Sequence, residues 1–292
     1  MSSAPQLPPL STPITRLLRV PPGPVDLDAY DPAGTPGVDE DDRDRVESGM
    51  DDLGQALSDL QERLYANGRV HQGSAPRVLL VLQGLDTSGK GGVIRHALGL
   101  MDPQGIHLAA FKKPTVEELA HDFLWRIERE VPAPGLIGVF DRSHYEDVVV
   151  ARVSALAAPE EIERRYGAIN QFETRLAAAG VVIIKCFLNV SYEKQGERLS
   201  ERLDRPDKHW KYNPGDLDTR RQWADHRAAY ETALERCNTP VAPWYVVPAD
   251  RKWYRNWAVA RLLAEALDSL ALAWPAADFD VAAERRRLAS LG

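Results

Sequence analysis

The stretch Gly84-Leu-Asp-Thr-Ser-Gly-Lys-Gly-Gly92 determines which fold we expect. It follows an apolar run at residues 78–82 and precedes a helix-forming segment at residues 93–98. Glycines let successive backbone N–H groups point at a phosphate, and the start of a helix adds partial positive charge. Strand, glycine loop and helix with the spacing G-x-x-x-x-G-K therefore predict a phosphate-binding P-loop, in which Lys90 reaches the phosphate that is transferred. A glycine-rich turn with a solvated Lys90 is the alternative, but it leaves four glycines in nine residues unexplained.

The loop departs from the common pattern at the position after the lysine. Gly91 stands where a Ser or Thr usually ligates Mg²⁺, while a carboxylate, Asp86, lies inside the loop. A negative side chain among phosphate oxygens is unfavourable unless a cation lies between them. We therefore expect Asp86 to hold Mg²⁺, or Mn²⁺ in its place. The remaining loop residues that we expect to contact phosphate are Gly84, Thr87, Ser88, Gly89, Gly91 and Gly92.

Composition places the chain among ordinary globular proteins. Its 292 residues suffice for one large α/β domain with extensions or for two small domains. No apolar stretch approaches the roughly 18 residues of a membrane helix, and the N-terminus lacks a secretory pattern, so we expect no membrane association and a cytoplasmic location. The two cysteines, Cys186 and Cys237, are too few for a disulfide framework or a metal site. A net charge of −7 argues against a nucleic-acid binder.

The two ends of the chain differ in pattern from its middle. Nine of the 21 prolines fall within residues 1–36, which indicates a poorly structured or extended arm at residues 1–38. Such an arm is a candidate to lie on a neighbouring subunit. Residues 39–271 are expected to form a single domain, and residues 272–292 a short tail helix.

A seven-residue repeat marks the first helix of that domain. Apolar residues recur at spacings of 4-3-4-3-4, namely Val46, Met50, Leu53, Leu57, Leu60 and Leu64. The pattern fits an amphipathic helix packed on its own domain, which we favour, and it also fits a contact between subunits. We expect a homo-oligomer, either a dimer or a tetramer.

Strands and helices alternate through the rest of the domain. The expected strands are residues 77–84, 106–112, 136–141, 181–188 and 244–247. The expected helices are residues 91–101, 116–130, 144–155, 160–179, 192–204, 218–236 and 253–269. Apolar strands separated by helices predict a parallel sheet covered on both faces, a three-layer α/β sandwich.

A second acidic residue follows the third expected strand, where Asp141 and then Arg142 end an apolar run. The carboxyl ends of parallel strands border the ligand crevice, so Asp141 can share Mg²⁺ with Asp86. Asp141 could instead cap the next helix, but together with Asp86 and Lys90 the catalytic interpretation is favoured. Arg142 can clamp a phosphate, and Glu146 can reach the metal or the acceptor, or serve the helix dipole.

Residues 196–227 are expected to form a lid over that crevice. Five cations on this segment are candidates for phosphate binding: Arg198, Arg202, Arg205, Lys208 and Lys211. The three arginines recur at i, i+4 and i+7, so they share one helix face. A solvated, salt-bridged helix is the alternative to a lid that grips anions. Two more cations follow the second expected strand, Lys112 and Lys113.

These residue types suit phosphoryl transfer, where catalysis is mostly positioning and charge neutralisation. No Ser-His-Asp or Cys-His arrangement stands out, and no N-K-x-D stretch indicates a guanine-reading switch protein. An acceptor that is itself a phosphate is already anionic at neutral pH and needs no general base. A nucleotide-phosphorylating enzyme fits these features.

Six ordered motifs resemble the polyphosphate kinase 2 family. They are the loop at 84–92, Asp102-Pro-Gln-Gly105, His121-Asp-Phe-Leu-Trp-Arg126, Val139-Phe-Asp-Arg-Ser-His-Tyr-Glu146, Asp207-Lys-His-Trp-Lys211 and Ala242-Pro-Trp-Tyr245. The resemblance covers about residues 45–271 and implies a thymidylate-kinase-like P-loop fold with a helical lid. It also implies reversible transfer of phosphate between inorganic polyphosphate and the nucleotides AMP, ADP and ATP.

The resemblance further implies roles for single residues. Asp86 and Asp141 would hold Mg²⁺, while Lys90 and Arg142 would contact the transferring phosphate. Arg198, Arg202, Lys208 and Lys211 would guide the polyphosphate chain, and Asp122 and Glu146 would face the nucleotide. The motifs at 102–105 and 121–126 are most similar to the subgroup that accepts nucleoside mono- and diphosphates, which often has Asn in place of Asp141.

Two other functions fit the sequence less completely. An ATP-dependent nucleoside or nucleotide kinase has the same fold and the same loop. A catalytically silent nucleotide-binding scaffold, assembled through the seam at residues 46–64, has no physical need for Lys90 together with Asp86 and Asp141.

Overall fold

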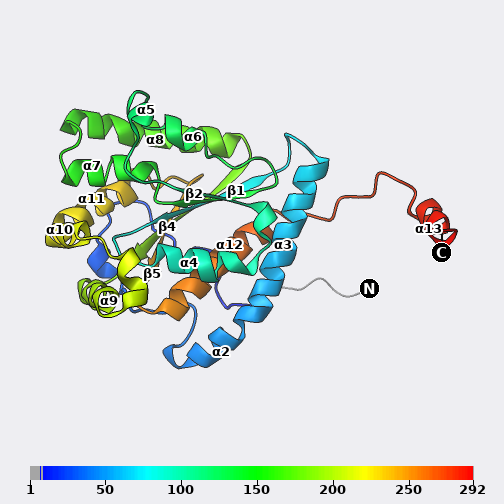
Figure 1. Cartoon of the computed structure of the whole chain (residues 1–292), viewed down its shortest axis with the longest axis horizontal. Coiled ribbons are helices and arrows are strands. Elements are labelled where there is room, and N and C mark those ends of the chain that lie inside the picture. Colours follow the sequence, from blue (N-terminus) through cyan, green and yellow to red (C-terminus); the bar gives the residue numbers. More distant parts are fainter. Residues whose placement is uncertain (1–6, 8, 292) are drawn as a thin grey trace.

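Five parallel strands form the centre of the computed structural model, which describes residue 7 and residues 9–291 (Figure 1). They are β1 (Arg77–Gln83), β2 (Ile106–Ala110), β3 (Ile137–Asp141), β4 (Val181–Asn189) and β5 (Trp244–Pro248), in the spatial order β2-β3-β1-β4-β5. All neighbouring pairs are parallel, so the predicted α/β fold with a parallel sheet is confirmed. In β1 every residue after Arg77 is buried, as expected for a central strand that is covered on both faces.

Helices cover both faces of the sheet and produce three layers (Figure 1). One face packs on α3 (Met50–Val70), α4 (Lys90–His96) and α12 (Lys252–Ser269), and the other on α7 (Val150–Val153), α8 (Pro159–Ala178) and α11 (Trp223–Arg236). Alternate residues of β1 point to opposite faces, so Leu80 joins the first core and Leu79 the second. The sheet thus holds its carboxyl edge fixed between two apolar cores.

The remaining helices lie in the connections. The α-helices are α1 (Ile14–Leu17), α2 (Arg43–Ser48), α5 (Val116–Leu119), α6 (Trp125–Glu128), α9 (Tyr192–Asp204), α10 (Gly215–Arg221) and α13 (Val281–Ala289). The 3-10 turns are η1 (Leu27–Ala29), η2 (Glu40–Asp42), η3 (Leu98–Leu100), η4 (Pro103–Gly105), η5 (His144–Asp147) and η6 (Pro206–Lys211).

Several expected helices have other bounds than predicted. The expected helix at 116–130 is two helices, since Thr115 caps α5 and the Asp122 carboxylate accepts the Leu124 N–H before α6 begins. The expected helix at 218–236 begins earlier, at Gly215, and breaks at Gln222 between α10 and α11.

The seven-residue seam packs on its own domain. Leu53, Leu57 and Leu64 are almost fully buried in the core that also contains Leu263 of α12, and Met50 is packed against the same core. The helix is interrupted at Gly49, so the seam runs over α2 and α3 rather than one rod. Leu53, Leu57 and Leu64 are therefore not available to a neighbouring subunit, whereas Met50 and Leu60 are only partly buried.

The N-terminal segment also packs on its own chain. Ile14, Leu18 and Val20 are buried, and the chain beside them forms backbone hydrogen bonds with β5. Further along, Tyr254 Oη donates a hydrogen bond to the carbonyl of Pro36. Of the two forms that we expected for this arm, poorly structured or extended, residues 13–38 fit the extended one, because they pack along β5 and α12. Residues 1–6 and 8 of that arm lie outside the described residues.

The C-terminal helix α13 extends away from the rest of the domain (Figure 1). None of its residues is buried. In the part of the chain that the structure describes, no helix combines the length and apolar character that crossing a bilayer requires.

A buried ion pair joins β4 to α8 beneath the loop that follows β3. Lys185 Nζ donates to Glu173 Oε2 (2.6 Å), to Tyr145 Oη (2.9 Å) and to the carbonyl of Cys237 (2.6 Å). Tyr145 Oη in turn donates to Glu173 Oε1 over 2.8 Å. Lys185 and Glu173 are at most 1% exposed, so each charge depends on the other for compensation.

We expect Glu173→Leu to lower the free energy of unfolding by about 3–5 kcal/mol, because it leaves the Lys185 charge buried and uncompensated. Adding Lys185→Met should restore most of the loss. Urea unfolding measures both effects. As a control, Glu128→Gln breaks an exposed pair with Arg175 and should cost less than about 1 kcal/mol. A single Glu173 variant as stable as the control would contradict the dependence of Lys185 on this pair.

Candidate functional site

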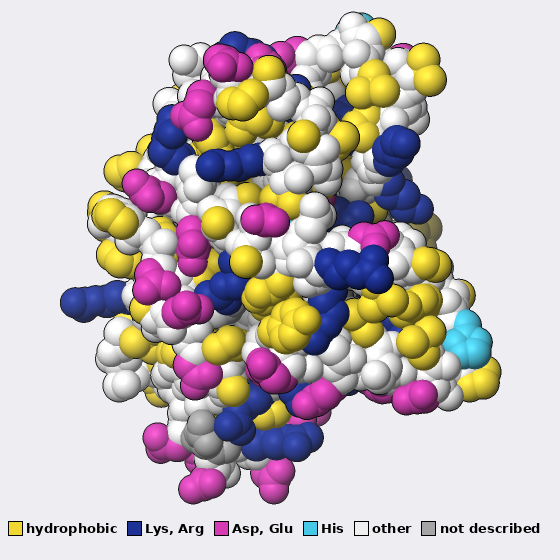
Figure 2. Space-filling view, turned by 90° about the vertical axis from the view of Figure 1, so that its left-hand side faces the viewer, with side chains coloured by type: hydrophobic (Ala, Val, Ile, Leu, Met, Phe, Trp, Pro, Cys, Tyr) yellow, Lys and Arg dark blue, Asp and Glu magenta, His cyan; other side chains and the backbone are white. Residues whose placement is uncertain are grey.

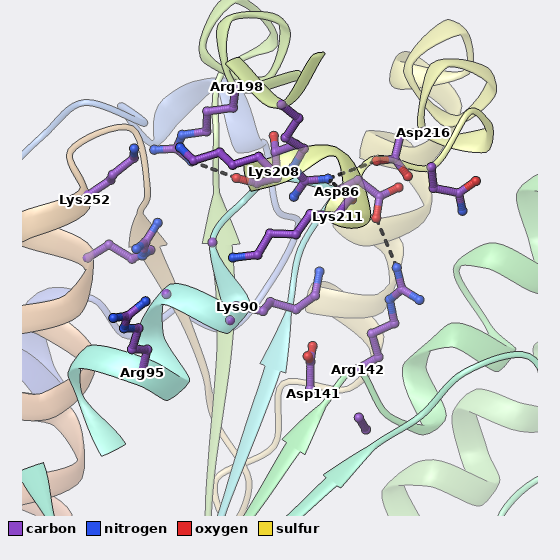
Figure 3. A pocket seen from close by; sticks show the side chains of 18 of the residues that line it. Asp86, Lys90, Arg95, Asp141, Arg142, Arg198, Lys208, Lys211, Asp216 and Lys252 are labelled. Carbon is purple, nitrogen blue, oxygen red and sulfur yellow. Dashed lines mark hydrogen bonds and ion pairs between the residues drawn. The ribbon is translucent and has the colours of Figure 1, made fainter. Parts of the chain in front are cut away.

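A cavity of about 820 Å³ opens at the carboxyl edge of the sheet, between the loop after β1 and the α9–α10 segment (Figure 3). The β1–β3 register pairs Leu82 with Asp141, which brings the ends of these strands together. Predicted site residues that line the cavity are Asp86, Thr87, Gly89, Lys90, Gly91, Gly92, Lys112, Asp141, Arg142, Arg198, Arg202, Lys208 and Lys211. Predicted site residues outside its lining are Gly84, Ser88, Lys113, Asp122, Glu146 and Arg205.

The loop after β1 has the backbone conformation of an anion cradle. Gly84 and Gly89 have φ values of 143° and 109°, which side chains rarely adopt, and Thr87 adopts a left-handed φ of 64°. Lys90 Nζ donates to the carbonyl of Gly84 over 2.7 Å, so its charge lies over the loop. Burial, followed by the charge of Arg142, lowers the pKa of Lys90.

Two buried arginines support this loop. Arg198 Nη1 donates to the carbonyl of Thr87 over 2.9 Å, and its Nη2 donates to the carbonyls of Ala249 and Asp250. Arg255 Nη1 donates to the carbonyl of Ser88 over 3.3 Å. Burial and the neighbouring charge of Arg198 lower the pKa of Arg255 to about 9. Both guanidinium groups thus add positive charge beneath the loop, while carbonyl oxygens accept their hydrogen bonds.

Two hydroxyl groups in the loop form no hydrogen bond with the described residues. Thr87 Oγ1 and Ser88 Oγ are buried and have no hydrogen-bond partner among the residues that the structure describes. Buried polar atoms without partners are uncommon in folded proteins. Thr87 also lines the cavity, so its hydroxyl fits a ligand rich in hydrogen-bonding oxygens, whereas Ser88 lies outside the lining.

The two predicted metal ligands face the same cavity. Asp86 Oδ1 accepts a hydrogen bond from Arg142 Nη2 over 3.0 Å, and Asp141 lies at the end of β3 (Figure 3). The described residues contain no group of three or more His, Cys, Asp or Glu side chains that could hold a metal ion. Mg²⁺ often uses only one or two carboxylates and takes its other ligands from phosphates and water, so this pair fits such an ion.

Arg142 lines the cavity, while Glu146 lies outside its lining. Arg142 has a left-handed φ of 64°, and its Nη2 donates to Asp86 Oδ1. Burial raises the pKa of Glu146, while the charges of Arg142 and Lys90 oppose that rise. The carboxylate of Glu146 therefore interacts with the lysine of the P-loop and with the arginine that follows β3.

The expected lid cations have different partners. Arg202 Nη1 donates to Asp216 Oδ2 over 3.1 Å and so joins α9 to α10, while Arg205 is exposed and paired with Asp207. Asp122 is also exposed, and lies 3.5 Å from Arg164. Of the cations predicted to bind phosphate, Arg205 is the one on this segment that the cavity does not include.

Charge distinguishes the cavity from the rest of the surface. Among the described residues, ten lysines and arginines but only four carboxylates line it. The whole chain has a net charge of −7, and acidic and basic side chains intermix over the outer face near α7, α9 and α10 (Figure 2). Such a focused positive potential attracts anions.

Sequence reasoning missed part of the lining. The residues not predicted include Arg95, His96, Glu201, Asp216, Lys252, Arg255 and Asn256. Lys252 and Arg255 lie at the start of α12, directly after β5. The rule that ligands bind beyond the carboxyl ends of parallel strands could have identified them.

Comparisons with known proteins identify the family of the chain. The family model of polyphosphate kinase 2 matches residues 41–273. The chain belongs to the polyphosphate kinase 2 family. It is 43% identical over 255 residues to the AMP/ADP-polyphosphate phosphotransferase of Meiothermus ruber, covering 87% of this chain and 93% of that protein. The ADP-polyphosphate phosphotransferase of Rhodopseudomonas palustris is 40% identical over 233 residues, or 76% of this chain and 78% of that protein.

A solved family member has the same architecture. The crystal structure of polyphosphate kinase 2 from Arthrobacter aurescens TC1 superposes with a TM-score of 0.92 at 49% identity, and the match covers 97% of this chain and 98% of that chain. Membership of the family, which the six motifs predicted, is thereby confirmed.

We expect Gly89→Ala to lower the free energy of unfolding by about 1–3 kcal/mol, because its φ disfavours a side chain. A Cβ there would also lie only 1.8 Å from Arg255 Nη1. Gly167→Ala is the control, since Gly167 lies inside α8 with open space around a Cβ, and it should stabilise by about 0.5–1 kcal/mol. Chemical unfolding compares the two variants, and equal effects would refute the tight fit between the loop and Arg255.

Proposed function

We propose that the protein transfers phosphate reversibly between inorganic polyphosphate and nucleotides, with ADP, AMP or both as acceptors. The named relatives from M. ruber and R. palustris are polyphosphate phosphotransferases for AMP/ADP and for ADP. The observation that supports this function most strongly is the cavity itself, where ten cations surround the P-loop in a chain of negative net charge. A flexible polyanion suits such a distribution of cations, because it can contact many of them in sequence.

The chemistry needs positioning more than proton transfer. Lys90 and Arg142 would contact the phosphate that moves, and the loop N–H groups would hold its oxygens. The attacking group on ADP or AMP is a phosphate oxygen, which is anionic at neutral pH, so no general base is required. Glu146, beside both cations, would keep their charge directed at the reacting phosphates.

Asp86 and Asp141 would hold Mg²⁺ or Mn²⁺. Bound there, the ion would neutralise charge on the reacting phosphates and fix their orientation. The position after Lys90 is Gly91, which has no hydroxyl group, so the two carboxylates would take the place of the Ser or Thr ligand that is common there. The hydrogen bond from Arg142, which joins the loop after β3 to the loop after β1, would keep Asp86 close to the phosphate site.

We further propose residues 39–271 as the catalytic domain and residues 196–227 as a lid, with residues 1–38 and 272–292 as flanking segments. The support for the lid is that α9 contributes Arg198 and Arg202, and η6 contributes Lys208 and Lys211, to the lining of the cavity. The homo-oligomer stays a prediction, which light scattering in solution tests.

Purified protein incubated with ADP, Mg²⁺ and long-chain polyphosphate, and no other phosphate donor, should form ATP. A parallel reaction with AMP determines the second acceptor. Lys90→Ala should reduce turnover by at least about a thousandfold, because it removes charge at the transferring phosphate. Lys194→Ala, on α9 outside the cavity, should keep wild-type turnover. ATP formation that requires a nucleoside triphosphate donor would refute polyphosphate as the donor.

Asp86→Asn should raise the Mg²⁺ concentration for half-maximal activity by at least about tenfold, because an amide is a weaker ligand for a hard cation than a carboxylate. The measurement is initial rate against Mg²⁺ concentration at saturating substrates. Asp268→Asn, exposed near the end of α12, is the matched control. An Asp86 variant with the Mg²⁺ curve of this control would rule out the metal-binding role.

A further inference from the structure

Two carboxylates that line the cavity, Glu201 and Asp216, do not belong to the metal pair. Asp216 pairs with Arg202, whereas Glu201 lies among several cations. Glu201 lies on α9, lines the cavity and is 37% exposed. Its Oε1 accepts a hydrogen bond from Lys208 Nζ and lies 3.6 Å from Arg205 Nη1. Its Oε2 lies 3.8 Å from Lys252 Nζ. The hydrogen bond from Lys208 lowers the pKa of Glu201, so this side chain is anionic at neutral pH.

The three cations around Glu201 come from different parts of the fold. Arg205 follows α9, Lys208 lies in η6, and Lys252 is the first residue of α12. Lys208 and Lys252 both line the cavity, and both are labelled in Figure 3. Glu201 therefore links the proposed lid to the body of the domain through cations that a phosphate would also contact.

An anion at this position opposes the binding of a polyanion. It repels neighbouring phosphates and it already satisfies the charges of Lys208 and Lys252. We propose that Glu201 is an internal counter-anion, which polyphosphate must displace from Lys208 and Lys252 to follow the cavity, and which thereby sets the affinity for polyphosphate. This inference rests on the proposed function, because it takes inorganic polyphosphate as the ligand.

The exchange has a measurable electrostatic consequence. Affinity for a polyanion falls with salt concentration, with a logarithmic slope that grows with the number of phosphate charges the protein neutralises. While Glu201 pairs with Lys208 and Lys252, polyphosphate releases fewer small ions when it binds them. Once the carboxylate is removed, phosphates are the only anions with which both lysines pair. The affinity for polyphosphate should therefore rise, and its dependence on salt concentration should steepen.

A purely structural role for Glu201 predicts the opposite result. If the carboxylate only holds Lys208 in a binding position, its loss frees the lysine to move and weakens polyphosphate binding. The direction of the affinity change and of the salt slope therefore separates a counter-anion from a positioning residue.

The test is Glu201→Gln, which removes the charge and keeps the shape. Its dissociation constant for long-chain polyphosphate, measured by isothermal titration calorimetry at several salt concentrations, should fall about three- to tenfold at low salt. The salt slope should steepen by about one unit. The KM for ADP should stay unchanged. Glu197→Gln is the matched control, because Glu197 lies one turn earlier on α9, pairs with Lys194 and does not line the cavity. It should keep the wild-type affinity and slope.

Each outcome tests the counter-anion role of Glu201, the proposed reaction, or both. Unchanged or weaker binding by Glu201→Gln, with a normal thermal melt, overturns the counter-anion. An equal gain in polyphosphate affinity in the Glu197 variant also overturns the counter-anion proposal, because the gain would then reflect the net charge of the protein alone. Wild type that binds polyphosphate but makes no ATP refutes the proposed reaction and leaves the binding comparison valid. Wild type that binds no polyphosphate refutes both.

Discussion

Repulsion among the cations around the cavity is the constraint on which the site depends. Charges of one sign held close together destabilise a fold unless something offsets them. The chain offsets them in different ways: Arg198 and Arg255 donate to backbone carbonyls, while Arg142 and Arg202 pair with Asp86 and Asp216. Carbonyl oxygens carry only partial charge, so the buried arginines keep most of their field. The cavity is therefore positive as well as stable.

The sequence predicted those parts of the site whose functional residues are contiguous in the chain or directly follow a strand. The P-loop is contiguous, and its glycines, Lys90 and Asp86 lie within nine residues between a strand and a helix. Asp141 was predictable because it ends an apolar strand, and the parallel register then places that end beside Leu82. Helical spacing indicated a common face for Arg198, Arg202 and Arg205, of which the first two line the cavity while Arg205 follows the end of α9 and does not.

What the sequence left open depends on contacts between distant segments. Arg255 lies beneath Gly89, but the two are separated by most of the domain, and no local pattern links them. Helical spacing also could not reveal what an arginine contacts, so Arg198 was expected to guide polyphosphate although it donates to the loop backbone. Likewise the prolines near the N-terminus indicated extended chain, while the burial of Ile14 and Leu18 depends on a surface that only the folded domain provides.

The buried ion pair of Lys185 and Glu173 connects stability to this site. Arg142 adopts a left-handed backbone conformation, which costs about 1–3 kcal/mol unless the surrounding structure enforces it. Three residues later, Tyr145 is fully buried and bonds to both Lys185 and Glu173. These bonds fix the chain directly after Arg142, so the strained residue cannot relax without disrupting a network in the core. The orientation of Arg142 toward Asp86 is thus supported by the packing of Tyr145 in the second core as well as by the attraction between the two charges.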